Sequence, residues 1–100
     1  MGASHTKKKE YIHSQSILQE IKENINGYKY DMEHTRDPFH RGSIAEHYNK
    51  RIQTLFQELD EYLETSQVRE NMHYNHINEI ISKSEELHEK YKYTKRSVKK

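Results

Sequence analysis

The sequence predicts an all-α protein in which two helices, at about residues 10–34 and 44–91, form an antiparallel hairpin. Apolar residues recur every three or four positions over most of the chain, which is the period of one helix face. Helix-breaking residues are rare, since the 100 residues include one proline and three glycines. The sequence shows neither the alternating pattern of a strand nor an internal repeat.

The first helix is predicted from an apolar stripe at Ile17, Ile21, Ile25, Tyr28 and Met32. Gly27 interrupts this segment, and a glycine inside a helix costs about 1 kcal/mol relative to alanine. Because the stripe continues beyond the glycine, we expect one helix that runs to about His34.

The corner of the hairpin is predicted at residues 38–46, which contain the only proline. Ser43 and Glu46 match a capping box, in which the serine accepts from a backbone N–H and the glutamate reaches back to the cap. The sequence therefore places the start of the second helix close to Ile44.

The second helix is predicted from a stripe that begins at Ile44 and resumes with Met72 after a polar gap at 64–71. Because the gap has neither proline nor glycine, we favour one continuous helix of roughly 70 Å at 1.5 Å per residue. Its far half would extend beyond the first helix, and a second subunit would cover it. The alternative left open is a bend near Ser66 that gives a three-helix bundle.

The composition indicates one small polar domain, at residues 10–93, between basic flexible tails at 1–9 and 94–100. Without cysteine, the chain has neither disulfides nor thiolate chemistry. Because basic ends of this kind are usually solvated tails, nucleic acid is not the expected partner, and binding of the ends to nucleic acid or to an anionic membrane surface is the alternative that they leave open. The sequence shows no membrane-spanning run and no signal-peptide core, which favours a cytoplasmic location or secretion without a cleavable signal.

The corner resembles the turn of the WXG (ESAT-like) proteins of type VII secretion, which are small antiparallel helical hairpins. Phe39 takes the place of the family's tryptophan, Gly42 that of its glycine, and Tyr48 that of the aromatic residue that follows. The resemblance implies a small partner, chaperone or substrate in type VII secretion, in which Phe39 packs against the base of both helices. It also implies that the helix faces pair with a partner hairpin into a four-helix bundle.

We therefore expect a non-enzymatic interaction protein whose partner is a helical domain or a second copy of the chain. It should need no cofactor, metal or small-molecule substrate, because no catalytic serine or histidine set and no phosphate-cradling loop is visible. The predicted turn and partner-binding residues are Phe39, Gly42, Ser43, Glu46, Tyr48, Ile52, Leu55 and Leu59.

Two other hypotheses come from short motifs. The pairs Glu10–His13, Glu70–His73 and Glu85–His88 have the spacing found in di-iron helical bundles, although eight histidines make chance matches common. Residues 1–6 match an N-myristoylation pattern, and Lys7, Lys8 and Lys9 follow it. A membrane-anchored helical adaptor is therefore the alternative function, and it requires an acylated Gly2.

Overall fold

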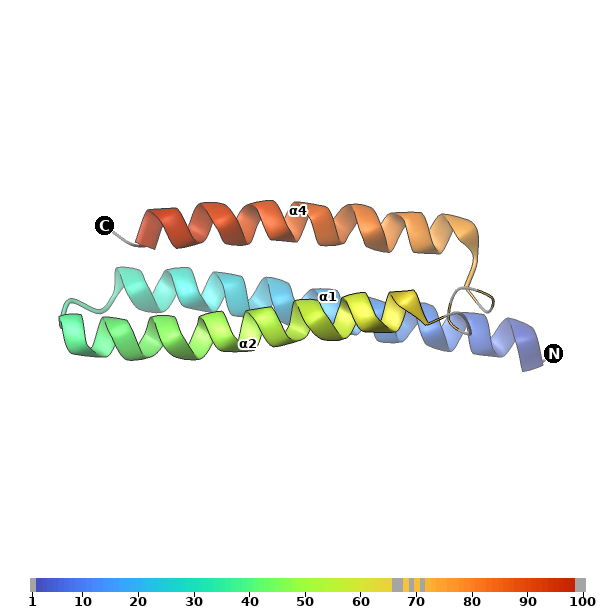
Figure 1. The fold of residues 1–100 in the computed structure, drawn as a ribbon, viewed down its shortest axis with the longest axis horizontal. Coiled ribbons are helices and arrows are strands. Elements are labelled where there is room, and N and C mark those ends of the chain that lie inside the picture. The colour runs from blue at the N-terminus through green and yellow to red at the C-terminus, as the bar shows by residue number, and fades with distance from the viewer. Residues whose placement is uncertain (1, 66–67, 69, 71, 99–100) are drawn as a thin grey trace.

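The long helices in the described part of the chain are α1 (Gly2–Glu33), α2 (Pro38–Glu64) and α4 (Tyr74–Val98). The computed structural model describes residues 2–65, 68, 70 and 72–98, and for residues 2–10 it describes the backbone alone. The helices lie along one long axis, with α1 and α4 parallel and α2 antiparallel to both (Figure 1). The molecule measures 55 × 18 × 18 Å.

The buried residues of α1 and α4 recur with the spacing of a heptad repeat. On α1 the buried residues include Ser14, Leu18, Ile21, Ile25, Tyr28 and Met32, and these alternate at intervals of four and three. On α4 the same spacing joins Ile80, Ser84, Tyr91, Thr94 and Val98. A repeat of 3.5 residues is that of helices that pack at a small crossing angle, side chain into hole. The core positions of α1 and α4 therefore follow the spacing of helices that pack side by side.

The all-α prediction is confirmed, and of its two arrangements the structure has the bent one. α2 ends at Glu64, and Thr65 leaves the helix with ψ of 121°. Val68 and Met72, in the connection, are 6% and 4% exposed and belong to the core. The continuous helix over residues 44–91 is therefore not formed, because the third apolar stripe packs against α1 of the same chain instead of a second subunit. Ser66 itself lies outside the described residues.

α1 is the central helix of the bundle. It packs closely against both α2 and α4, whereas α2 and α4 are held further apart from each other. Gly27 does not interrupt α1, so the prediction of one helix to about His34 is confirmed.

The ends of the chain are more ordered than the sequence analysis expected. The backbone of α1 is helical from Gly2, and α4 continues to Val98. Thr94 and Val98 are 4% and 6% exposed, because they occupy core positions of the heptad pattern. Residues 94–98 are thus part of the bundle and not of a flexible tail.

Candidate functional site

The predicted turn residues lie on α2 and not in the turn. The chain reverses direction at residues 34–37, and α2 begins at Pro38 with Asp37 as its N-cap. An Asp37 carboxylate oxygen accepts from the backbone N–H of Phe39 at 3.2 Å, and proline is favoured at the first helical position because it needs no N–H partner there. Ser43 and Glu46 are exposed residues inside α2, so the predicted capping box is wrong.

Phe39 and Gly42 do not have the structural roles that the family resemblance implied. Phe39 is 85% exposed, so it does not pack against the base of both helices. Gly42 lies within α2 with open space around its Cα, and its backbone needs no glycine. The residues that carried the resemblance therefore do not form the hairpin turn.

The other predicted partner-binding residues are mostly in the protein's own core. Ile52, Leu55 and Leu59 are each 0% exposed, so their side chains hold α2 in the bundle and are not available to a partner. Tyr48 is half-buried, and its ring stacks on Tyr28 with the centroids 5.7 Å apart. The structure thus does not bring the eight predicted residues together as one surface.

Arg41, near the start of α2, holds the ends of the helices together, and the sequence patterns did not predict this role. Its guanidinium donates hydrogen bonds to the backbone oxygens of Met32 and Thr35 and to that of Val98. Because α1 and α4 are parallel, their C-terminal ends lie at the same end of the bundle, and both present carbonyl groups with partial negative charge. One half-buried arginine therefore caps two helices.

Tyr48 fixes the distance between α1 and α2. Its hydroxyl donates to Asp31 at 2.7 Å, and this bond to the carboxylate, together with burial, raises the pKa of Tyr48 above 10.0. The same hydroxyl oxygen lies 3.0 Å from the position of a Cβ atom on residue 27. Gly27, and not Gly42, is thus the glycine that permits a close approach between helices.

A groove runs between α2 and α4, where the two helices stand apart. Its floor is aromatic: Phe56 stacks on His88 with ring centroids 3.7 Å apart, and Tyr91 lies beside Phe56 at 6.1 Å. The hydroxyl of Tyr91 donates to the Asn49 side-chain oxygen at 2.5 Å, and burial raises the pKa of that hydroxyl. We call this feature the α2–α4 groove; its volume is about 550 Å³.

The walls of the α2–α4 groove carry more negative than positive charge. Four acidic residues line it, against two lysines; the acids are Asp60, Glu61, Glu64 and Glu89, and the lysines are Lys92 and Lys95. Lys95 is occupied over the ring of Tyr91, with its ammonium 4.8 Å from the centroid. The groove therefore attracts cationic groups.

Exposed apolar side chains continue along the α4 edge of this groove. Tyr74 and Ile81 precede His88 by two heptads and one, so they lie on the same side of α4. They are 76% and 41% exposed, so their apolar atoms are available for contact beside the groove.

The described residues contain no cluster of three or more histidine, aspartate or glutamate side chains suited to a metal ion. His88 stacks on Phe56, and His73 and His76 form an edge-to-face pair with centroids 5.7 Å apart. The side chain of Glu10, in the first of the predicted pairs, lies outside the described residues. Within the described part of the chain, no helix combines the length and apolarity that a membrane crossing requires. Comparison with protein-family models, with curated proteins and with solved structures gave no match to this chain.

Proposed function

We propose that the protein is a non-enzymatic interaction module that binds an amphipathic helix of a partner protein in the α2–α4 groove. The observation that carries this proposal is the separation of α2 and α4, which both pack against α1 and leave a groove of about 550 Å³ between them, above the buried rings of Phe56 and Tyr91. A helix that lies in this groove would complete a four-helix bundle, and helix-in-groove binding is a common mode of recognition.

The apolar and charged side chains of the groove indicate which residues the bound helix should carry. The exposed ring of His88 would contact its apolar face, and Ile81 and Tyr74 would extend that contact along α4. The excess of carboxylates on the walls favours lysine or arginine residues beside the apolar face of the partner. The family resemblance implied a partner hairpin that packs against Ile52, Leu55 and Leu59. The partner helix proposed here binds a different surface, the α2–α4 groove.

The proposal does not depend on type VII secretion. That role rests on the resemblance of the corner at Phe39 and Gly42, and the exposure of both residues gives it no geometric support. A helical partner is still expected, but the surface that binds it is the α2–α4 groove.

Photo-crosslinking in the native cells tests the proposal. A crosslinking amino acid is placed at Gln57 or Lys92, one on each wall of the groove. The matched controls are Glu58 and Tyr93, exposed positions of the same two helices that do not line the groove. We expect one partner to be captured from both groove positions and from neither control. The double substitution Asp60→Lys and Glu64→Lys should abolish this capture, whereas Glu23→Lys on α1 should not. Equal capture from the control positions, or none from the groove, would contradict the proposal.

A further inference from the structure

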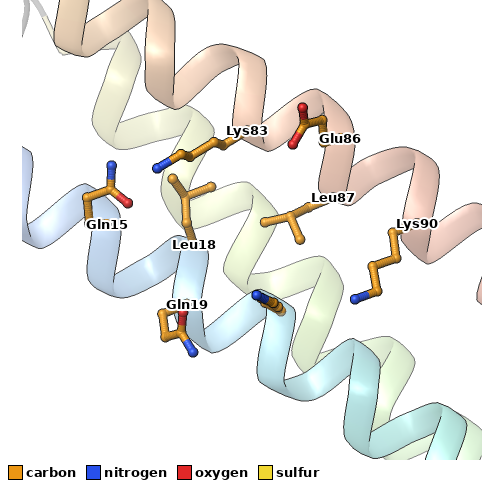
Figure 2. A pocket seen from close by; sticks show the side chains of 8 residues that line it. Gln15, Leu18, Gln19, Lys83, Glu86, Leu87 and Lys90 are labelled. Carbon is orange, nitrogen blue, oxygen red and sulfur yellow. The ribbon is translucent and has the colours of Figure 1, made fainter.

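A second groove, between α1 and α4, differs from the α2–α4 groove in charge. Figure 2 shows its lining, with Gln15 and Leu18 projecting from α1 and Lys83, Leu87 and Lys90 extending from α4 toward them. Its volume is about 340 Å³, which is within the range of small-ligand sites. We call it the α1–α4 groove.

Three lysines against one carboxylate line the α1–α4 groove: Lys22, Lys83 and Lys90, with Glu86. Lys83 is paired with Glu79, its Nζ being 3.1 Å from a carboxylate oxygen. For Lys22 and Lys90, no ion pair occurs among the described residues. Two ammonium groups from opposite walls are therefore without a counter-charge.

A buried donor points to the same kind of ligand. The side-chain nitrogen of Gln15 is shielded from solvent and finds no hydrogen-bond acceptor within the described part of the chain. A buried N–H without an acceptor lowers the stability of the fold, and a bound oxyanion would supply the acceptor. Leu18, 4% exposed, and the half-buried Leu87 form an apolar floor beneath these donors.

From this arrangement we infer that the α1–α4 groove binds a phosphate group carried by a small molecule or by a lipid headgroup. Lysine binds phosphate as a compact point charge, and two uncompensated ammonium groups match the charge of a phosphate monoester. Nucleic acid fits less well, because the lysines form a local cluster on a chain of net charge +1 and not a continuous basic track. This inference is independent of the helix-binding proposal, because none of its residues lines the α2–α4 groove.

Calorimetric titration of the full chain tests the inference, with inorganic pyrophosphate and water-soluble short-chain phosphatidic acid as separate probes. Phosphatidylcholine vesicles with and without phosphatidic acid provide the membrane arm. Saturable binding of pyrophosphate assigns a soluble phosphate compound, whereas binding of phosphatidic acid alone assigns a lipid headgroup. Either result supports a phosphate site, and binding of no probe overturns it.

Matched variants separate a site from general charge attraction. The double substitution Lys22→Gln and Lys90→Gln should weaken binding about tenfold or more. Lys50→Gln with Arg96→Gln removes the same charge from exposed positions outside both grooves and should leave the affinity unchanged. Gln15→Glu should also weaken binding, because it replaces the free donor by a carboxylate. Equal weakening in the two double variants that remove positive charge would overturn the inference, provided that circular dichroism shows both variants to be folded.

Discussion

The Nη2 atom of Arg41 donates a hydrogen bond of 3.0 Å to the backbone oxygen of Val98, which lies 57 positions further along the chain. This bond joins the start of α2 to the end of α4. The same guanidinium also binds the end of α1, so one side chain connects all three helices. At the end of the bundle that holds the turn at residues 34–37, Arg41 therefore joins α2 to the C-terminal ends of both α1 and α4.

Substitution Arg41→Met should lower the free energy of unfolding by about 2 kcal/mol, because it removes charge-assisted hydrogen bonds to backbone oxygens. Arg41→Lys should recover only part of the loss, since one ammonium group cannot reproduce the planar fork of the guanidinium. Urea denaturation measures both variants. Arg36→Met changes an exposed arginine in the turn that precedes α2 and is the control, and an equal loss in that variant would refute the special role of Arg41.

Gly27 and Tyr48 should show coupled effects on stability. Alanine at position 27 gains about 1 kcal/mol in helix propensity, but its Cβ would lie 3.0 Å from the Tyr48 hydroxyl oxygen. In the wild-type chain the close contact should offset part of this gain. A Tyr48→Phe background removes the hydroxyl oxygen but keeps ring carbons Cε1 and Cζ, 3.3 and 3.4 Å from the Cβ position, so Gly27→Ala should be more favourable there than in the wild-type chain. A double-mutant cycle by urea denaturation measures the coupling. The same effect of Gly27→Ala in both backgrounds would show that the close approach has no energetic consequence.

The N-cap of α2 provides a third test. Asp37→Ala should lower Tm, because it removes the acceptor for the Phe39 N–H, whereas Ser43→Ala should not lower it. Hydrogen bonds from the His40 side chain and from the Phe39 N–H lower the pKa of Asp37. The cap therefore stabilises the folded state above the ordinary aspartate pKa and loses its effect as the pH falls through the lowered value. Thermal unfolding at several acidic pH values measures this, and a larger loss for Ser43→Ala would restore the predicted capping box.

Alkaline pH should destabilise the bundle through its tyrosines. The pKa of Tyr48 is raised by its bond to Asp31, and that of Tyr91 is raised by burial. Their contribution is complete below the ordinary tyrosine pKa of about 10 and is lost as the pH rises through the raised values, because the unfolded chain releases the protons first. Urea denaturation at increasing pH measures this loss. It should be smaller in the Tyr48→Phe and Tyr91→Phe double variant, and an unchanged pH dependence would assign the effect to other groups.

The helical class and most core positions could be predicted from the sequence, because local periodicity determines which face of a helix is apolar. The buried set of α1, from Ile17 to Met32, follows directly from that stripe. The bend after Glu64 could not be predicted in the same way, because the connection contains no helix-breaking residue. It forms because the stripe of α4 gains a core when it packs against α1, which is a tertiary effect that outweighs local helix propensity.

The surface features were harder to predict than the core. Arg41 follows the only proline by three residues, but its partners lie nine, six and 57 positions away. The α2–α4 groove joins Phe56 to His88, and the α1–α4 groove joins Lys22 to Lys90. Each pairing depends on the return of α4, and no local pattern in the sequence encodes it. The N-cap was predictable, since aspartate followed by proline is a known helix start, but the capping box at Ser43 was favoured instead.

The central claim is that α4 folds back to the turn of the hairpin, because both grooves depend on it. The distance between spin labels at Arg36→Cys and Ser97→Cys tests this most directly, and the absence of native cysteines makes both labels unique. Arg36 and Ser97 line one surface depression in the structure, so pulsed electron–electron double resonance should give a distance far shorter than the length of the bundle, which is 55 Å. A continuous second helix would instead carry residue 97 roughly 80 Å from the turn, at 1.5 Å per residue, and a distance of that order would contradict the account.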